Sequence, residues 1–346
     1  MKVGLIGCGE ISQFHMDIFQ RLKNVEVVAV SDILLDRAQN FAKRWGVDKY
    51  FVDYNELLEI EELDFVDICT PVWTHAAIAI DTAKSGHNVL LEKPMSLSSK
   101  DCEEMIETAK KHDVSLCVNH HNLFYPSIKK AKSLVESGYF DLQSFEVSFY
   151  KNLYIKKLPA WAYRPEYGGL LWEVGTHPTY LTHHFLPDIK KVYAVGKKNG
   201  PVYDGFSVLL STSNNSYGIM KFSFTSNYRE EYMCQITSQN GNGAKIFISL
   251  DSFLDQSKFI SKAPMKFLKE EKDHLVSWTK AALRSIYHRR RYYDFMNSKY
   301  LLMKRYVESI QNKSPPPVAP EDGKATIVLL ESIKESLETG KAVPIK

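Results

Sequence analysis

The sequence of 346 residues is too long for one ordinary hydrophobic core, so we expect two domains. Hydrophobic residues make up 44% of the chain and charged residues 25%, which are values typical of globular proteins. The formal net charge of +3 is too small to favour nucleic acid as a partner.

The sequence favours neither secretion nor insertion into a membrane. Met1 leads directly into an apolar run at 3–6, without the charged and cleavable regions of a signal peptide. Nowhere do 18 apolar residues follow one another, so no transmembrane segment is expected. The five cysteines are odd in number and scattered, which fits reduced thiols. We therefore predict a cytoplasmic protein.

A glycine-rich turn follows the first predicted strand, residues 3–6, and leads into an amphipathic stretch at 14–22. Glycines at this spacing allow a tight turn and let the main chain approach a pyrophosphate, while the next helix presents free amide groups to it. Ser12 stands where the pattern usually has its third glycine. A glycine turn with no ligand is the alternative. The turn reads Gly7-Cys8-Gly9-Glu10-Ile11-Ser12.

An acidic residue ends the second predicted strand, residues 25–30, about twenty residues after the glycines. The carboxylate of Asp32 would hydrogen-bond the ribose hydroxyls of adenosine, whereas its charge would repel the 2′-phosphate of NADP. We therefore predict NAD as the cofactor, with NADP less favoured. An aspartate that only caps a helix is the alternative.

Strands and helices continue to alternate up to residue 118. Six strands with intervening helices predict a doubly wound parallel sheet, a Rossmann domain at 1–122. Ligands bind such sheets at the carboxyl ends of the strands, where the runs at 70–75 and 119–122 lie. The further helices are predicted at 35–45, 54–60, 76–85 and 98–112, and the further strands at 50–51, 65–70, 88–91 and 115–118.

The strand at 88–91 stops abruptly on Glu92, Lys93 and Pro94. Such a buried strand would place Glu92 and Lys93 at the edge of the sheet where ligands bind. Pro94 restricts Lys93 to extended geometry and so directs its ammonium group. A salt-bridged strand end is the alternative for this stretch taken alone.

The sequence pattern changes after residue 122 and predicts a C-terminal α+β domain at 123–346. Because the alternating strands have one solvated face, they predict a large, mostly antiparallel open sheet, and the fold class is α/β. Such a sheet needs helices or a second subunit to cover its other face, so we expect a homodimer or homotetramer formed through it. The helix is predicted at 128–136 and the strands at 145–149, 206–210, 217–224, 232–237 and 245–250.

Four motifs, in this order, resemble those of the glucose-fructose oxidoreductase and inositol dehydrogenase family, often called Gfo/Idh/MocA. The resemblance covers most of the chain and is weakest at 251–304. It implies a Rossmann domain, a C-terminal domain with a large open sheet and a pyridine-nucleotide cofactor. We assign cofactor binding to Gly7, Gly9, Glu10, Ile11, Asp32, Thr70, Pro71, His75, Glu92, Lys93 and His121. The motifs are the glycine turn, Thr70-Pro71 with His75, Glu92-Lys93-Pro94, and the run Gly-Gly-Leu-Leu-Trp-Glu-Val-Gly-Thr-His at 168–177.

The last motif supplies the candidate base. Oxidation of a secondary alcohol needs a group that removes the hydroxyl proton, and His177 titrates in a suitable range. We assign to Glu173 the task of orienting His177 and raising its basicity, and to Lys93 a hydrogen bond to the reacting oxygen. The family more often has Asp in place of Glu173 and of Tyr180, so the roles of Lys93 and His177 carry over best. Pro178 indicates that the helix begins near His177.

The leading prediction is an NAD-dependent oxidoreductase that transfers a hydride from a secondary alcohol of a sugar, nucleotide sugar or cyclitol. One alternative is a family member that holds NAD tightly and uses transient oxidation for epimerisation or glycosidic cleavage. Another is a non-catalytic, sugar-sensing co-regulator. No metal is expected at His183-His184 with His177 and Glu173, because adjacent histidines on a helix point in different directions.

A basic and aromatic segment at 278–305 holds Arg284 and the run Arg289-Arg290-Arg291. A solvated face of a long helix, or of a broken pair, is the simplest interpretation. The alternatives are binding of a substrate pyrophosphate and contact with an anionic membrane surface. A last helix is predicted at 320–337.

Overall fold

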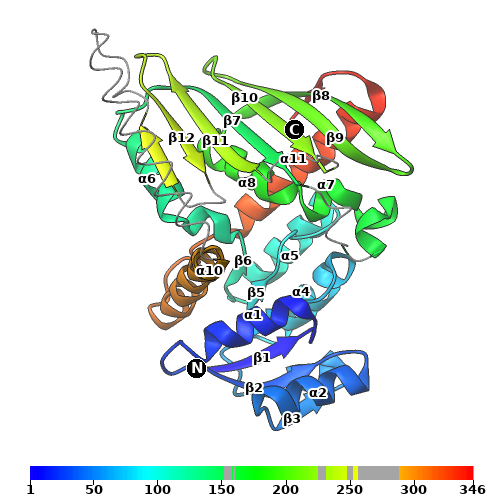
Figure 1. Cartoon of the computed structure of the whole chain (residues 1–346). Helices are drawn as coiled ribbons and strands as arrows, with labels where there is room; N and C mark the ends of the chain where they lie inside the picture. The colour runs from blue at the N-terminus through cyan, green and yellow to red at the C-terminus, as the bar shows by residue number, and fades with distance from the viewer. Residues whose placement is uncertain (152–157, 159, 225–230, 248–251, 256–287, 346) are drawn as a thin grey trace. The chain divides into compact units, whose positions relative to one another are not determined.

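The chain packs as two compact units. The first unit is Met1–His121 with Lys299–Val328, and the second is Asn122–Ser298 with Leu329–Lys346. The domain division expected at residue 122 stays a prediction, and it differs from these units in the placement of 299–328. The computed structural model describes residues 1–151, 158, 160–224, 231–247, 252–255 and 288–345, with only the main chain at 231, 252, 253, 255 and 288–295 (Figure 1).

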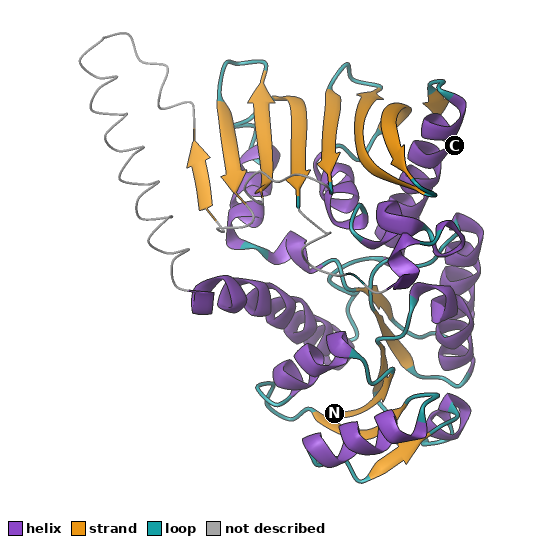
Figure 2. Cartoon of the chain, turned by 45° about the vertical axis from the view of Figure 1, so that its right-hand side comes forward, coloured by secondary structure: helices purple, strands orange, loops and turns teal. Residues whose placement is uncertain are grey.

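The first unit is built on a six-stranded sheet in which all neighbouring strands are parallel. The expected doubly wound sheet is confirmed. Its central strands are mostly apolar and buried, apart from Asp67 in β4, because helices cover both faces (Figure 2). In order across the sheet, the strands are β3 (Lys49–Phe51), β2 (Glu26–Ser31), β1 (Lys2–Ile6), β4 (Phe65–Ile68), β5 (Asn88–Leu91) and β6 (Leu116–Val118).

The helices of the first unit follow the strands directly. The first helix begins at Glu10, four residues earlier than predicted, so the glycine turn leads straight into it. Asp53 and Ser98 cap α3 and α5 by accepting main-chain N–H groups, as short polar side chains do at helix starts. These helices are α1 (Glu10–Phe19), α2 (Leu35–Trp45), α3 (Tyr54–Leu58), α4 (His75–Lys84) and α5 (Ser99–Lys111), with the 3₁₀ turns η1 (Val72–Thr74) and η2 (His121–Phe124).

Two late helices, α10 (His288–Gln311) and α11 (Pro320–Thr339), are divided between the units, and their stretch Lys299–Val328 extends the first unit with residues from far along the chain. Tyr306 of α10 is fully buried, packs edge-on against Phe65 of β4 and donates its hydroxyl to a main-chain oxygen after α5. Residues 278–287 lie outside the described residues, as do the side chains of 288–295, so the alternatives for the arginine-rich segment stay predictions.

The second unit is built on an eight-stranded sheet. All its neighbouring pairs are antiparallel except β7 with β10, so the expected mostly antiparallel sheet is confirmed. The strands β8, β13 and β14 were not predicted. In order across the sheet, the strands are β13 (Ser252–Asp255), β12 (Gly243–Phe247), β11 (Glu231–Ser238), β7 (Leu142–Tyr150), β10 (Tyr217–Ser223), β9 (Val202–Thr212), β8 (Ile189–Asn199) and β14 (Val343–Pro344).

One face of this sheet is covered by helices and carries the core of the second unit. Alternate residues of β9, including Phe206 and Val208, are buried there, and Phe145 of β7 stacks on Phe185 at 4.6 Å between ring centroids. Within the described chain, none of the helices has the length and hydrophobicity needed to span a membrane. The helices of the unit are α6 (Pro126–Glu136), α7 (Gly169–Glu173) and α8 (Thr176–Phe185), with the 3₁₀ turns η3 (Ala160–Tyr163) and η4 (Pro165–Tyr167).

Candidate functional site

The glycine turn between β1 and α1 is closely packed at Gly7 and open at Gly9. Gly7 has a φ of +96°, and a Cβ there would lie 2.8 Å from the main chain of Cys69, so only glycine fits. A Cβ at Gly9 would meet nothing within 4 Å. The first turn of α1 therefore opens, without a side-chain cap, onto free space beside Gly9, as a pyrophosphate site requires. Ser12 is fully buried and fills the third position.

Asp32 lies at the carboxyl end of β2, next to the glycine turn. Its carboxylate accepts the main-chain N–H groups of Cys8 and Leu34, each at 3.0 Å. Arg37 of α2 approaches the same carboxylate at 3.6 Å and is half exposed. The side chain is thereby held at the strand end, where the adenosine ribose would lie in a dinucleotide fold.

We expect NAD to bind more tightly than NADP, and Asp32→Ala to narrow the gap. The carboxylate favours ribose hydroxyls and repels a 2′-phosphate, and its removal leaves Arg37 to pair with that phosphate. Titration of both cofactors by tryptophan fluorescence measures the effect. Asp36→Ala removes an exposed carboxylate next to Arg37 on α2 and should leave the ratio of the NAD and NADP affinities unchanged. Equal or tighter NADP binding by the unmodified protein would contradict the assignment.

Thr70, Pro71 and His75 follow β4, and the imidazole of His75 is enclosed by main chain. Its two ring nitrogens lie 2.8 Å from the carbonyl oxygens of Thr70 and Pro94, and the residue is 1% exposed. Burial lowers the pKa of His75, so the ring is neutral and donates to one carbonyl at a time. The structure therefore gives His75 a bracing role between two strand ends, while contact of these residues with the cofactor stays a prediction.

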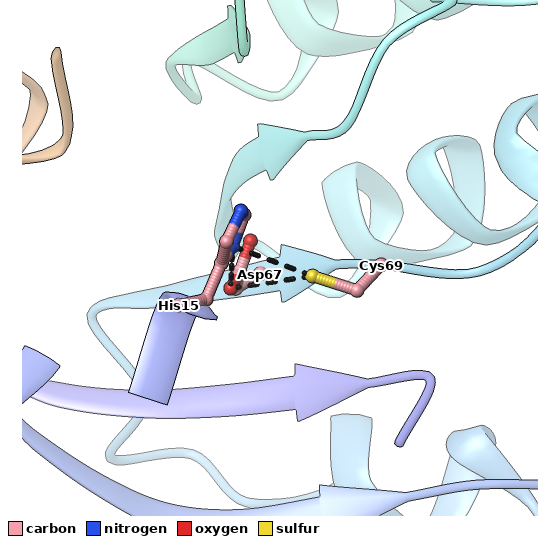
Figure 3. Close-up of side chains that lie close together, drawn as sticks. All are labelled: His15, Asp67 and Cys69. Carbon is pink, nitrogen blue, oxygen red and sulfur yellow. Dashed lines mark hydrogen bonds and ion pairs between the residues drawn. The ribbon is translucent and has the colours of Figure 1, made fainter. Parts of the chain in front are cut away.

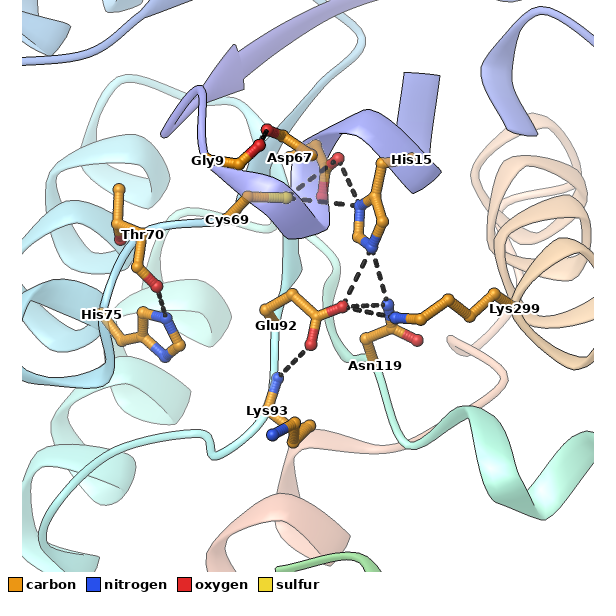
Figure 4. A network of polar contacts seen from close by, with 11 residues as sticks. Gly9, His15, Asp67, Cys69, Thr70, His75, Glu92, Lys93, Asn119 and Lys299 are labelled. Atoms are coloured by element: carbon orange, nitrogen blue, oxygen red, sulfur yellow. Dashed lines mark hydrogen bonds and ion pairs between the residues drawn. The ribbon is translucent and has the colours of Figure 1, made fainter. Parts of the chain in front are cut away.

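Glu92 follows β5 and turns into the interior of the unit (Figure 4). Its Oε1 accepts from Lys299 Nζ at 2.7 Å, Asn119 Nδ2 at 2.8 Å and His15 Nε2 at 2.9 Å. Its Oε2 accepts the main-chain N–H of Lys93 at 3.0 Å. Burial alone would raise the pKa of Glu92, but Lys299 and His15 outweigh burial and hold that pKa well below its usual range.

His15 of α1 joins this carboxylate to a second one. Its Nδ1 lies 2.7 Å from Oδ2 of Asp67, while its Nε2 faces Glu92, and both His15 and Asp67 are fully buried. Burial alone would lower the pKa of His15, yet the two carboxylates outweigh it and raise the pKa to about 9. Since both ring nitrogens face acceptors, the ring is a charged imidazolium at neutral pH.

His15, Asp67 and Cys69 place three atoms of ligand type within 4.8 Å of one another (Figure 3). The 2.7 Å contact between His15 and Asp67 is a hydrogen bond, and His15 is also engaged by Glu92. Burial raises the pKa of the Cys69 thiol well above its usual value, which disfavours the thiolate that binds metals. We interpret the cluster as part of the charged network, and the expectation of no metal stays a prediction.

His121 follows β6 and is 3% exposed. Burial and the nearby cation of Lys299 hold the pKa of His121 well below its usual range, so the ring is neutral. A neutral imidazole at this strand end suits the predicted place beside a cofactor. In the first unit, the residues assigned to cofactor binding thus lie in the segments that follow β1, β2, β4, β5 and β6, with Glu10 and Ile11 in the first turn of α1 and His75 at the start of α4.

In the second unit, Glu173 and His177 belong to two short helices instead of one. Glu173 is the last residue of α7, and His177 is the second residue of α8. Gly175 joins the helices, and a Cβ there would lie 2.3 Å from the carbonyl oxygen of Leu171. The start of α8 near His177 agrees with the position of Pro178, which needs no hydrogen-bond partner in a first helical turn.

Tyr180 is a side chain that the structure places against His177. Its hydroxyl lies 3.0 Å from Nδ1 of His177 and accepts the main-chain N–H of Asn122 at 3.1 Å. When Nδ1–H donates to this hydroxyl, Nε2 keeps its lone pair and can take a proton. The sequence alone predicts no role for Tyr180, which stands where the family often has Asp. The role assigned to Glu173 stays a prediction.

Sequence reasoning missed His15, Asp67 and Lys299, which hold the Glu92 carboxylate directly or through one another. Asp67 gave a local signal, because a charged residue inside the apolar run at 65–68 requires a buried partner.

The site residues fall in both units: Lys93 in the first, Glu173 and His177 in the second. Their joint action on one substrate stays a prediction.

Comparison with known protein families gives matches in both units. Residues 1–120 match the model of an oxidoreductase family with an NAD-binding Rossmann fold, GFO_IDH_MocA. Residues 128–242 match the model of the GFO/IDH/MocA C-terminal domain. The two matches follow one another along the chain as the two sheets do.

Individual relatives cover the whole chain at low identity. Myo-inositol 2-dehydrogenase of Thermotoga maritima is 25% identical over 356 residues, with 100% of this chain and 99% of that protein aligned. The crystal structure of a probable dehydrogenase from Thermotoga maritima has a TM-score of 0.79 at 23% identity, covering 100% of this chain and 99% of the other. The WlbA dehydrogenase of Bordetella pertussis, crystallised with NADH and UDP-GlcNAcA, has a TM-score of 0.82 at 18% identity, covering 100% and 98%. The structural likenesses show the shared fold.

Proposed function

The chain belongs to the Gfo/Idh/MocA family of oxidoreductases, and we propose that it is an NAD-dependent dehydrogenase of a sugar, nucleotide sugar or cyclitol. The observation that carries this proposal is the meeting of three features at one edge of the first sheet. They are the open glycine turn, the carboxylate of Asp32, and Lys93 held directly after Glu92.

Each of these residues would do one task. The first turn of α1 and Asp32 would hold the two ends of the adenosine diphosphate part of NAD. NAD supplies the acceptor for the hydride that leaves the alcohol carbon. Lys93 would donate a hydrogen bond to the reacting oxygen and stabilise the negative charge that develops there. His177, with Tyr180 at its Nδ1, would take the hydroxyl proton on Nε2.

The substrate class rests on relatives as well as on chemistry. A relative named myo-inositol 2-dehydrogenase and a structural neighbour crystallised with UDP-GlcNAcA support cyclitols and nucleotide sugars as candidates. A panel of inositols, free sugars and nucleotide sugars, scored by NADH absorbance at 340 nm, tests the proposal. We expect one class to give turnover that depends on both NAD and the substrate. No turnover with any class, in protein that binds NAD, would contradict it.

The panel also distinguishes a dehydrogenase from two alternatives, an enzyme with transient oxidation and a non-catalytic co-regulator. An enzyme that oxidises and re-reduces its substrate would retain NAD through purification and change the substrate without accumulating NADH. A sugar-sensing co-regulator would bind a panel member without any conversion. Product analysis by mass spectrometry beside the absorbance assay distinguishes all three.

We place the protein in the cytoplasm, in agreement with five buried cysteines.

We further propose that the protein forms an oligomer of identical chains through the sheet of the second unit. The face of that sheet opposite its helices exposes large apolar side chains on neighbouring strands. Leu209 of β9 pairs with Tyr193 of β8 and with Ile219 of β10. Leu209 and Tyr193 are 51% and 43% exposed. A row of this kind on a monomer is typical of an interface.

Leu209→Lys should shift the protein from a dimer or tetramer to a monomer, because it places an uncompensated charge in the row. Light scattering after size-exclusion chromatography measures the mass. Glu338→Gln, which makes the same change of charge on an exposed part of α11, should leave the mass unchanged. A monomeric unmodified protein would refute the proposed interface.

A further inference from the structure

Four charged side chains meet in the interior of the first unit, and they come from distant parts of the sequence. Lys299 is 1% exposed, Glu92 is 4% exposed, and His15 and Asp67 are fully buried. The two positive and two negative charges balance. Apolar residues of similar size would fill the same space without the cost of removing ions from water, so stability alone gives a poor account of this arrangement.

Through the Glu92 carboxylate, the network holds the main-chain nitrogen of Lys93. Lys299 is one of three donors on Oε1 of Glu92, so that oxygen is saturated. The other oxygen, Oε2, accepts the main-chain N–H of Lys93 at 3.0 Å. The carboxylate is therefore fixed at both oxygens, and the main chain of Lys93 is fixed by it.

We propose that Lys299 is a positioning residue for the reaction: it keeps Glu92 charged and oriented, and Glu92 holds Lys93 in place. Lys299 acts through Glu92 and not on the reacting atoms. The inference rests on the proposed function, because it assumes that Lys93 acts on the substrate oxygen. It adds a residue from α10 to the part of the site in the first unit, which is otherwise built from residues 1–121.

Lys299 has no substitute among the neighbouring donors. Asn119 is neutral, and His15 is shared between Glu92 and Asp67, so without Lys299 two carboxylates would depend on one imidazolium. Glu92 would then take up a proton more readily and would lose a donor that orients it. Five titratable groups from different elements interact with Glu92: His15 from α1, Cys69 after β4, His75 from α4, His121 from η2 and Lys299 from α10. Asp67 of β4 faces His15, and the main-chain N–H of Lys93 faces Glu92 itself.

The test compares Lys299→Met with Lys299→Arg. We expect the Met variant to lose about 10- to 100-fold in kcat while the KM for NAD stays near its original value, since a small displacement of a catalytic group lowers turnover steeply. The Arg variant keeps the charge and should retain most of the turnover. The acid limb of the pH profile should move to higher pH in the Met variant, because Glu92 protonates more readily.

A second readout does not depend on the reaction. Modification of Lys93 by trinitrobenzenesulfonate, followed by peptide mass spectrometry, should change in rate in the Met variant and stay unchanged in the Arg variant. If no panel compound is oxidised by the unmodified protein, the proposed function fails while this labelling still reports the position of Lys93. Lys304→Met, the same substitution at an exposed position of α10, serves as the control in both assays.

Three results would overturn the inference. They are a folded Met variant with turnover and labelling equal to those of the control, an Arg variant as impaired as the Met variant, or a rise in the KM for NAD that accounts for the whole loss. Where Lys299→Met does not fold, Lys299→Gln takes its place. Gln can still donate to Glu92 but carries no charge, so normal turnover in this variant would equally exclude the charge-holding role.

Discussion

Lys93→Met should lower turnover by about two to four orders of magnitude while leaving the affinity for NAD largely intact. Methionine keeps the length and apolar bulk of the side chain and removes the charge that would stabilise the reacting oxygen. The main-chain hydrogen bond from residue 93 to Glu92 remains available, so the strand end should keep its conformation. Steady-state kinetics give the loss in kcat, and isothermal titration gives the dissociation constant of NAD.

Lys100→Met is the matched control for this prediction, because Lys100 is an exposed lysine on α5 in the same unit. It should leave both turnover and NAD affinity unchanged. Near-normal turnover of Lys93→Met would identify Lys93 as a strand-end residue without a catalytic role. Unfolding of the variant would assign it a structural role instead, and circular dichroism separates these two outcomes.

His177→Gln should reduce kcat about 10²- to 10⁴-fold at neutral pH, because the amide cannot take up the hydroxyl proton. It should leave NAD binding unchanged, since the glycine turn and Asp32 belong to the first unit. The loss should shrink as the pH rises, because hydroxide then competes as the base. The pH dependence of kcat, measured for both proteins across the neutral range, tests this expectation.

Two further variants on α8, at Tyr180 and His183, test whether a loss of turnover is specific to His177. Tyr180→Phe removes the hydroxyl at Nδ1 and should cost about tenfold or less, because it disturbs the tautomer and orientation of the ring without removing the base. His183→Gln, the same substitution as His177→Gln on the same helix, should have little effect. Equal losses from the changes at His177 and His183 would show that α8 needs these imidazoles for packing and would exclude His177 as the base.

Most of the first sheet could be predicted because its signals are local. An apolar run that stops on turn residues specifies a buried strand without reference to the rest of the chain, and 88–91 is such a run. In the second sheet the alternation at 206–210 located β9, but alternation has no direction. The parallel pairing of β7 with β10 therefore could not be predicted. The four lysines of β8 obscured the alternation of its buried residues Val192 and Ala194.

The candidate site divides in the same way. The spacing of Gly7, Gly9 and Asp32 specifies a nucleotide turn within one strand-helix-strand segment. The partner of Glu92, by contrast, lies 207 residues further along the chain at Lys299. No periodicity in a single sequence connects two such positions, because each depends only on the folded packing. The buried Asp67 showed that partners had to exist and left their identity open.

The return of 299–328 to the first unit has a consequence for how the protein is made. Met1–His121 emerges from the ribosome long before Lys299 is synthesised, because the whole of 122–298 is made in between. During that interval the Glu92 carboxylate lacks the charge of Lys299 and shares the imidazolium of His15 with Asp67, and the surface that Tyr306 later covers on Phe65 is exposed. Breaking a buried ion pair costs about 3–5 kcal/mol, a large part of the stability of a domain. The nucleotide-binding half, although first in the sequence, should therefore reach its final stability only near the end of translation.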